Sequence, residues 1–230
     1  MSALSYDLVI VVKSSSDTLK AMTQRCINSA RQDKANLNII IVETSGIKHH
    51  YRDVDRIVMY KGPFNYNHAL NEGLKYATGD IYIMANNDLI FHKGWSEIGT
   101  SMIVNEYPSA SALSEGHILK GFKRGDYVYP GYAIAYHVAG WCIFCTKECY
   151  DKIGGLDETF EFWYSDNVYA DQLIKAGIKH GLFCNVQVDH MTSATLRTIP
   201  PKDQRRYSYD LTGKYNSLKR RMDASRETIK

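Results

Sequence analysis

Along the first 85 residues, apolar runs typical of strands alternate with segments whose apolar residues recur at helical spacing. This pattern is typical of an α/β protein. The segment Asp7–Val12 is an apolar run, as expected of a strand buried on both faces. Apolar residues then recur at helical spacing from Leu19 to Ala30, after a Ser-Ser-Ser-Asp start signal. The pattern continues with strands at Asn38–Val42, Arg56–Tyr60 and Ile81–Ala85 and with a helix at Tyr66–Ala77. This order predicts a mostly parallel central sheet flanked by helices.

The second half of the chain is less regular. A helix is predicted after Gly94-Trp95, a strand near Trp141–Thr146, a helix near Asp166–Ala176 and a strand at Leu182–Val188. Residues 115–140 are rich in Gly and Tyr without clear periodicity, and we interpret them as loops over a site. No linker rich in Pro, Ser or Gly divides the chain. We therefore expect one domain over residues 1–200, followed by a basic helical tail, 201–230, that packs on this domain or extends from it.

The charge is uneven along the chain, although the net charge is only +3. Residues 197–230 carry ten Lys or Arg against four Asp or Glu. Such a tail, with Lys219, Arg220 and Arg221 as its candidate contacts, could bind phosphate, DNA or another anionic surface. It could equally be the solvated end of an amphipathic helix.

The cysteines and the apolar runs limit the class of protein further. Five scattered cysteines do not suggest a disulfide framework. The spacing of Cys142, Cys145 and Cys149 could serve zinc, but a buried strand is predicted there, cysteine is a common core residue, and no fourth ligand is evident nearby. No apolar run has the length of a signal peptide or a transmembrane helix, so a cytoplasmic location is expected.

Polar residues follow three of the predicted strands, where ligands bind to parallel sheets. These ends are Lys13-Ser14-Ser15, Glu43-Thr44-Ser45 and Asn86-Asn87-Asp88. The Asp88 carboxylate could hold a divalent cation, and the neighbouring Asn side chains could bond to a ribose or a base. An Asx turn that simply ends the strand is the simpler interpretation of the third segment. Three polar ends at one edge of the sheet nevertheless suggest a single binding site.

Two further residues could bind a metal or act as a general base. His190 ends the last predicted strand and could share a metal with an Asp at another strand end, although a lone His is usually an ordinary surface or core residue. Asp166 follows an aromatic run and precedes a helix. It could be a general base held beneath aromatic walls, or it could cap the helix. The residues around Asp166, taken alone, favour the interpretation that Asp166 caps the helix.

Several segments together resemble the core of the family 2 glycosyltransferases. They are Phe64–Asp80, the strand with Asn86-Asn87-Asp88 and Gly94-Trp95, Gly140–Thr146, Ile153–Phe160 and Tyr164–Gly177. The resemblance spans about residues 5–195. It implies a Rossmann-like GT-A fold, a nucleotide-sugar donor and inversion at the anomeric carbon.

The resemblance also implies roles for single residues. Asp166 matches the base, and Asp88 and His190 match ligands of a divalent metal, Mn²⁺ or Mg²⁺. Ser165 and Lys13 depart from the pattern, because they stand where the family usually has Glu and Asp. The residues expected at the nucleotide-sugar are Ser14, Glu43, Asn71, Asn86 and Asn87, and those expected at the acceptor are Trp141, Trp163 and Tyr164.

These expectations describe an inverting, metal-dependent enzyme that moves a sugar from a nucleotide-sugar, expected to be UDP-linked, to an acceptor hydroxyl. The acceptor is expected to be a glycan, free or lipid-linked, or another polymer. A modified base in DNA is the alternative acceptor, suggested by the basic tail. Two other functions stay open: a non-catalytic nucleotide- or carbohydrate-binding module, motivated by Ser165, and a nucleotidyltransferase, which would release pyrophosphate.

Overall fold

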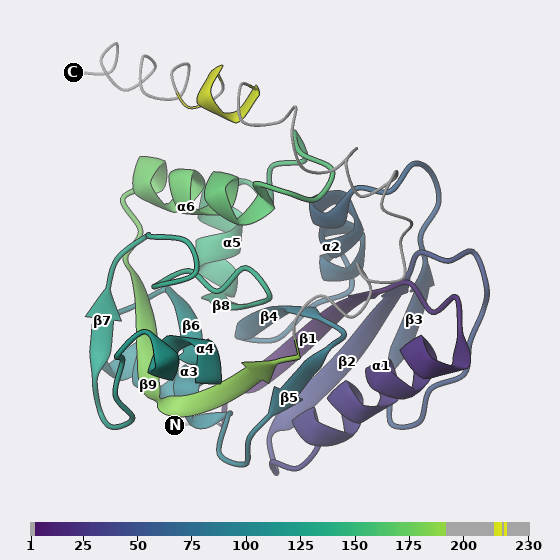
Figure 1. The fold of residues 1–230 in the computed structure, drawn as a ribbon, viewed down its shortest axis with the longest axis horizontal. Helices are drawn as coiled ribbons and strands as arrows, with labels where there is room; N and C mark the ends of the chain where they lie inside the picture. The colour runs from purple at the N-terminus through teal and green to yellow at the C-terminus, as the bar shows by residue number, and fades with distance from the viewer. Residues whose placement is uncertain (1–2, 192–213, 218, 220–230) are drawn as a thin grey trace.

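A nine-stranded sheet runs through the computed structural model, which describes residues 3–191, 214–217 and 219 (Figure 1). Its strands follow the order β3-β2-β1-β4-β8-β6-β9-β5, and β7 pairs with β9 beside this path. The strands are β1 (Ser5–Val12), β2 (Asn36–Glu43), β3 (Arg56–Met59), β4 (Ile81–Asn86), β5 (Leu89–Phe91), β6 (Ser109–Leu113), β7 (Val128–Pro130), β8 (Cys142–Thr146) and β9 (His180–His190). The helices are α1 (Asp17–Ala30), α2 (Tyr66–Leu74), α3 (Glu97–Val104), α4 (Glu115–Leu119), α5 (Lys147–Ile153) and α6 (Ser165–Ala176).

The first four strands of this order are parallel, as predicted. β1 pairs with β2 on one side and with β4 on the other, and β3 joins β2. The register places Val12 opposite Glu43 and Val11 opposite Asn86. The carboxyl ends of these three strands therefore lie side by side, which is the arrangement expected for one binding edge.

The other half of the sheet is mixed. β4 and β6 pair antiparallel with β8, and β5 and β7 pair antiparallel with β9, whereas β6 and β9 run parallel. The α/β prediction is confirmed, and parallel pairing is found in β3-β2-β1-β4 and between β6 and β9. Sequence patterning did not predict β5 or β6, nor α4 and β7 within the expected loops 115–140. β6 consists of small residues except for Leu113, and its strand form depends on the burial of all five residues between neighbouring strands.

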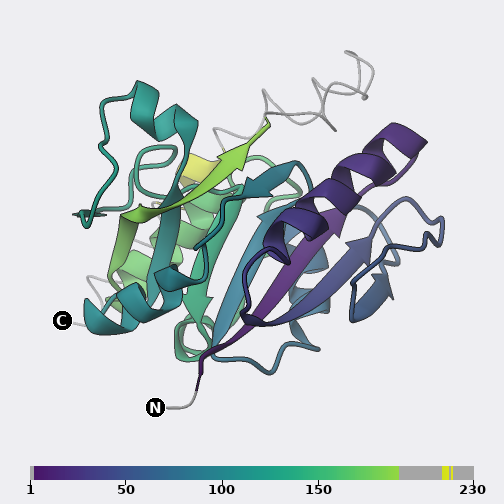
Figure 2. The ribbon, with the colours of Figure 1, turned by 90° about the horizontal axis from the view of Figure 1, so that it is seen from below.

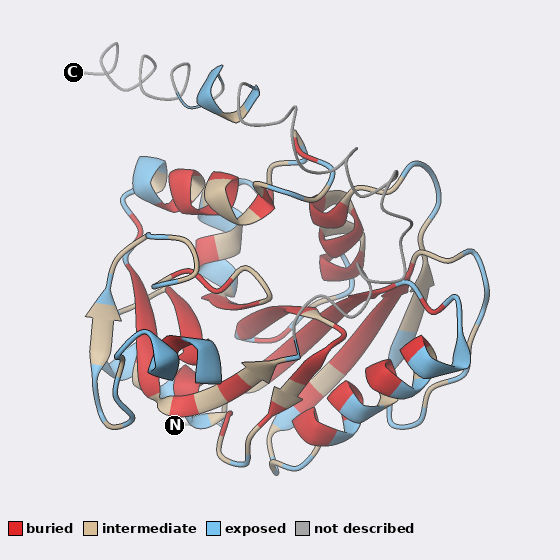
Figure 3. Cartoon of the chain, in the orientation of Figure 1, coloured by how far each residue is buried: buried red, intermediate tan, exposed pale blue. Residues whose placement is uncertain are grey.

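Helices cover both faces of the sheet. Alternate residues along β1 belong to the cores on opposite faces. Leu8 and Ile10 belong to one core with residues of α1 and α3, whereas Val9 and Val11 belong to another with residues of α2, α5 and α6. Figure 3 shows this buried centre in the strands and on the inner sides of the helices. A Cβ at Gly73 would lie 2.5 Å from Val9 Cγ1, so its absence lets α2 lie directly on the sheet.

The turned view separates the layers and shows α1 lying along the sheet (Figure 2). All five cysteines are free and buried. Cys142 and Cys145 lie on β8 but belong to the cores on opposite faces, so these two cannot share a zinc ion. No helix in the described ranges is long and apolar enough to cross a membrane.

Candidate active site

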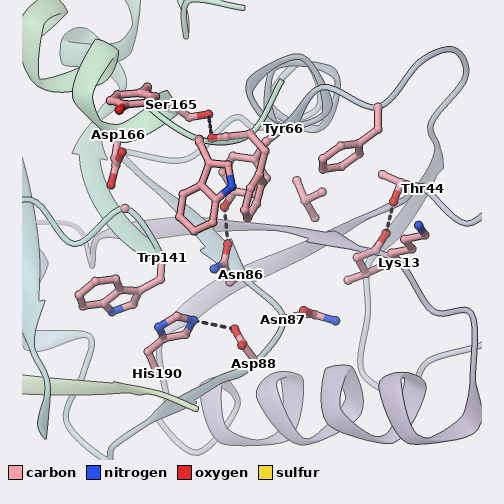
Figure 4. A pocket seen from close by; sticks show the side chains of 17 residues that line it. Lys13, Thr44, Tyr66, Asn86, Asn87, Asp88, Trp141, Ser165, Asp166 and His190 are labelled. Atoms are coloured by element: carbon pink, nitrogen blue, oxygen red, sulfur yellow. Dashed lines mark hydrogen bonds and ion pairs between the residues drawn. The ribbon is translucent and has the colours of Figure 1, made fainter. Parts of the chain in front are cut away.

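A pocket of about 310 Å³ opens at the carboxyl edge of the parallel strands (Figure 4). Residues from β1, β4, β9 and the segments preceding β8 and α6 line it, although they lie far apart in the sequence. The expected site residues found in its lining are Asn86, Asn87, Asp88, Trp141, Trp163, Tyr164, Asp166 and His190. Ser14, Glu43 and Asn71 are not in its lining.

Asp88 and His190 meet at one side of the pocket. Asp88 lies between β4 and β5, and the antiparallel register of β5 and β9 places Leu89 opposite His190. His190 Nε2 consequently lies 3.1 Å from Asp88 Oδ1. The imidazole also stacks on Trp141, with ring centroids 5.2 Å apart and an interplanar angle of 6°. The ring is thereby held with one nitrogen toward the carboxylate.

The two Asn side chains beside Asp88 are anchored from different directions. Asn86 Oδ1 accepts a hydrogen bond of 2.8 Å from the Tyr66 hydroxyl, and burial raises the pKa of that phenol. Asn87 Nδ2 donates to Thr23 Oγ1 at 3.0 Å. Asn87 is buried against α1, and Asn86 is the more accessible of the two. Asn86 is therefore the better placed of the two to bond a ligand.

Ser14 and Glu43 form a buried support behind the pocket. Glu43 Oε1 accepts hydrogen bonds from the backbone N–H of Ser14 at 3.2 Å and of Ser45 at 2.9 Å. The Tyr51 hydroxyl bonds to both the Ser14 hydroxyl and Glu43 Oε2. These bonds join the ends of β1 and β2. Both predicted side chains are fully buried, so they hold this edge in shape instead of facing the pocket.

The neighbours of this support, Lys13 and Thr44, do line the pocket. Lys13 is the only Lys or Arg among the described lining residues, and Figure 4 places it beside Thr44, well away from Trp141 and Asp166. The sequence placed Lys13 at a polar strand end and as a departure from the family pattern, but suggested no role for its side chain. Its position at the end of a strand was the available signal. Tyr51 was missed because it belongs to no predicted element.

Asn71 contributes to packing outside the pocket. Its amide nitrogen donates to the Leu156 carbonyl at 2.8 Å, and its amide oxygen accepts from the Leu156 N–H at 3.1 Å. The same oxygen accepts from the Tyr150 hydroxyl at 3.0 Å. These bonds tie α2 to the turn that follows α5. The structure therefore places Asn71 in a supporting position, not in contact with a pocket ligand.

Asp166 lies in the first turn of α6 and faces the pocket. The helix begins after Tyr164, its N-cap residue, which has the left-handed φ of 70° and whose side chain forms no capping hydrogen bond. Asp166 is therefore not the N-cap residue of α6, although its carboxylate bonds within the first turn. Asp166 Oδ1 accepts from the N–H of Asn167 at 3.0 Å, and burial raises the pKa of the carboxyl above its usual range. Such a group is suited to accept a proton.

Gly140 provides the space that the Asp166 carboxyl occupies. A Cβ at Gly140 would lie 2.6 Å from Asp166 Cβ and 2.7 Å from Asp166 Oδ2, closer than real Cβ atoms approach. The next residue, Trp141, is stacked on His190. The Gly140-Trp141 segment thus contacts both Asp166 and the imidazole of the Asp88–His190 pair.

Aromatic rings form much of the wall of the pocket. Trp163 is 39% exposed and packs edge-on against Phe162, with centroids 5.4 Å apart. Ser165, which stands in place of the family's usual Glu, donates its hydroxyl proton to the Phe162 carbonyl at 2.5 Å. That bond helps to close the turn before α6. The rings of this wall are Phe64, Tyr66, Trp141, Phe162, Trp163 and Tyr164.

Comparisons with known proteins identify the first half of this architecture. Residues 7–110 match the sequence model of glycosyl transferase family 2. This segment belongs to that family. No curated protein sequence matches the chain.

The fold matches that of a solved glycosyltransferase. The crystal structure of GalNAc-T7 with UDP, GalNAc and Mn²⁺ superposes with a TM-score of 0.69 at 14% sequence identity. The alignment covers 86% of this chain and 45% of that chain, so this chain spans less than half the length of GalNAc-T7. At such low identity the likeness shows the fold alone. Residues 7–110 thus match the glycosyl transferase family 2 model, and the chain has a GT-A fold.

The Asp88–His190 pair has the donor atoms that a divalent metal of this fold would need. A carboxylate and an imidazole are both ligands of Mn²⁺, and these two already lie 3.1 Å apart at the pocket edge. Within the described ranges no group of three or more His, Cys, Asp or Glu could hold a metal. Further ligands beyond this pair would come from a bound phosphate and from water, which suits an ion shared with a nucleotide.

Proposed function

We propose that this protein is an inverting glycosyltransferase that moves a sugar from a nucleotide-sugar, UDP-linked, to a hydroxyl of a glycan. The observation that carries the proposal is the separation of two acidic groups within one pocket. Asp88 is paired with His190 at one side, whereas Asp166 is half-buried in a pocket lined by aromatic rings and has a raised pKa. The Asp88 carboxylate is thus suited to bind a metal, and the Asp166 carboxylate is suited to accept a proton.

Asp88 and His190 would hold Mn²⁺ or Mg²⁺, which supplies charge neutralisation for the departing nucleoside diphosphate. Lys13 adds a permanent positive charge at the strand edge, and the Asn86 amide offers a hydrogen-bonding group beside it. The bonds of Glu43 to the N–H groups of Ser14 and Ser45 keep this edge in one shape. The donor end therefore needs little rearrangement when a nucleotide binds.

Asp166 accepts the proton of the acceptor hydroxyl as that oxygen attacks the anomeric carbon. The C–O bond to the diphosphate breaks as the new glycosidic bond forms, and the proton remains on the Asp166 carboxyl. A single displacement of this kind inverts the anomeric centre and requires no covalent enzyme intermediate. Removal of the proton by a placed base is typically worth about 10²–10⁴ in rate.

The aromatic wall favours a glycan acceptor, because sugar rings present apolar C–H faces that pack on Trp and Tyr. The DNA acceptor suggested by the basic tail draws no support from the matched family or the matched structure. Of the tail residues expected to bind a polyanion, Lys219 lies 3.9 Å from Asp171 on α6. Arg220 and Arg221 lie outside the described residues.

A panel of nucleotide-sugars tests the proposal, each with and without Mn²⁺. Thermal unfolding should shift upward with the correct donor, because a ligand that binds only the folded state stabilises it by mass action. The reaction products then separate the open functions. A glycosyltransferase releases nucleoside diphosphate, a nucleotidyltransferase releases pyrophosphate, and a binding module binds the donor but releases neither.

A further inference from the structure

The described part of the C-terminal segment packs on the aromatic wall from outside the pocket. The Tyr215 ring stacks on the Tyr164 ring, with centroids 5.0 Å apart and an interplanar angle of 20°. It also meets the Phe160 ring edge-on at 6.2 Å. Lys214 Nζ donates to the Thr159 carbonyl at 2.6 Å. Figure 1 shows this short helical piece, in yellow, beside α6.

A buried carboxylate fixes the other end of the Tyr215 side chain. The Tyr215 hydroxyl donates to Asp171 Oδ2 at 3.0 Å, and Asp171 on α6 is only 7% exposed. Burial and the adjacent Asp171 carboxylate raise the pKa of Tyr215 to about 12, so the phenol stays protonated and keeps donating. Lys219 Nζ lies 3.9 Å from the second oxygen of Asp171. Tyr215 therefore joins α6 to the segment that precedes it.

Tyr164 connects Tyr215 to the pocket, because it contacts the Tyr215 ring and also lines the pocket. It lines the pocket and is the N-cap of α6 with a φ of 70°, a conformation that costs a non-glycine residue of order 1–3 kcal/mol. Asp166 follows two residues later. A strained residue persists only where its surroundings fix it, and the Tyr215 ring covers the Tyr164 ring.

We infer that Tyr215 is a positioning residue: it holds Tyr164 in its left-handed conformation and thereby sets the start of α6 and the direction of the Asp166 carboxyl. This inference rests on the proposed function, in which Asp166 is the base. The donor end is independent of the contact, because Asp88, His190 and Asn86 lie on β4, its following turn and β9. Loss of Tyr215 should therefore affect transfer and leave nucleotide affinity unchanged.

The test compares Tyr215→Ala, which removes the stack and the hydrogen bond, with Tyr215→Phe, which keeps the ring and loses only the bond to Asp171. Tyr76→Ala is the matched control, because Tyr76, like Tyr215, has a cation over its ring, but it is exposed and does not line the pocket. Hydrogen exchange is followed over residues 159–170 and over α1. UDP affinity is measured with Mn²⁺, and UDP release is measured from the donor that the panel identifies.

In Tyr215→Ala, exchange over residues 159–170 should accelerate while α1 stays protected, because a local contact is lost and not global stability. UDP affinity should match that of the wild type, and UDP release should slow by about 10-fold, within the range that a misplaced catalytic group costs. Tyr215→Phe should recover most of the rate. Tyr76→Ala should behave as the wild type in all three measurements.

Unchanged exchange over residues 159–170 in Tyr215→Ala, equal acceleration over α1, or a wild-type rate would each overturn the inference. An equal loss of UDP affinity and turnover would also overturn it, because it would place the effect at the donor end. Failure of the wild-type protein to bind UDP or to release it from any donor is a different result. That outcome refutes the proposed function and the catalytic part of this inference, while the exchange measurement still decides whether Tyr215 orders the wall.

Discussion

The two ends of the pocket, which we propose to bind the donor and the acceptor, are built differently. At the donor end, neighbouring parallel strands stop in register, and their polar side chains bond to one another, as Glu43 does with Ser14 and Tyr51. At the acceptor end, loops carry aromatic rings, and Tyr164 holds a strained backbone conformation there. The donor end is therefore preformed by the sheet, whereas the acceptor end depends on contacts between loops and helix termini.

The boundary of the family match follows the same division. Residues 7–110 contain Lys13, Asn86 and Asp88 but end before Trp141 and Asp166. The segment shared with the family thus carries the donor end, apart from His190. The aromatic wall comes largely from the part of the chain beyond this match. Substitutions at the two ends should consequently separate donor binding from transfer, and the following predictions test that separation from the largest effect to the smallest.

Replacement of the half-buried Asp166 carboxyl at the acceptor end should have the largest effect. Asp166→Asn keeps the shape and removes the proton acceptor, so turnover at saturating donor should fall by about 10²-fold or more. UDP affinity with Mn²⁺ should stay near that of the wild type, because the donor contacts lie elsewhere. Turnover above about a third of the wild-type value would contradict the role of Asp166 as the base.

The pH dependence gives a second measurement on the same variant. Burial raises the pKa of Asp166, so the carboxyl becomes protonated as the pH falls through a value above its usual range. The wild-type rate should decline through that pH, and Asp166→Asn should lack this decline. The stability of the fold should change with pH in the opposite direction to the rate. The folded state favours the protonated acid, so the contribution of Asp166 to the free energy of unfolding falls as the pH rises through the raised pKa. Asp166→Asn should therefore unfold at an equal or higher temperature than the wild type near neutral pH.

Replacement of the metal-binding carboxylate should affect the donor end instead. In Asp88→Ala, Mn²⁺ should no longer strengthen UDP binding, a loss of at least about 10-fold, since even outer contacts of metal ligands are worth about 10–100-fold. His92→Gln is the matched control: His92 Nε2 forms a similar pair with Asp189 Oδ2 at 2.7 Å, but neither residue lines the pocket. Isothermal titration with and without Mn²⁺ measures the UDP affinity of both variants. An undiminished Mn²⁺ effect in Asp88→Ala would refute the metal site.

The contact between Gly140 and Asp166 should be sensitive to a single methyl group. Gly140→Ala places a Cβ 2.7 Å from the present position of Asp166 Oδ2, so the carboxyl must move. Turnover should fall by about 10-fold or more, since small displacements of catalytic groups cost up to about 10²-fold. Unfolding should be easier by about 1–3 kcal/mol, as is usual for overpacking.

Gly116→Ala serves as the control for this variant, because its Cβ would meet only Ser114 Oγ at an ordinary 3.7 Å. Thermal unfolding and UDP release should match the wild type there. If Gly140→Ala retained wild-type turnover, the Asp166 carboxyl would not need its present position.

The smallest effect is expected at Lys13. This side chain is exposed, and charge pairs in water are worth about 0.2–1 kcal/mol, so Lys13→Met should weaken UDP binding only a few-fold. Uridine, which lacks the diphosphate, should bind both proteins equally. Lys13→Arg should retain affinity. A greater loss for uridine than for UDP would place Lys13 at the base instead of the phosphates.

The sequence predicted the position of the binding edge for a physical reason, but not all of the contacts made there. Strand ends in a parallel sheet must meet at one edge, so the positions of Asn86 and Asp88 followed from the apolar run before them. The stacking of Trp141 on His190 and the contact of Gly140 with Asp166 depend on loops whose course has no periodicity. Asn71 was misplaced because a motif position does not show which way a helical side chain points. Ser14 and Glu43 were assigned to the right edge, but burial directs their side chains to each other.

The most direct test of the central claim is the product formed from a nucleotide-sugar by the wild-type protein. With Mn²⁺, a UDP-sugar and a glycan acceptor from a mixed panel, mass spectrometry should detect UDP and a glycan heavier by one sugar residue, and NMR of that product should show an inverted anomeric centre. Asp166→Asn, run beside it, should bind UDP with wild-type affinity and form at least about 10²-fold less product in the same time. Release of pyrophosphate, or UDP binding without any sugar transfer or hydrolysis across the panel, would contradict the account.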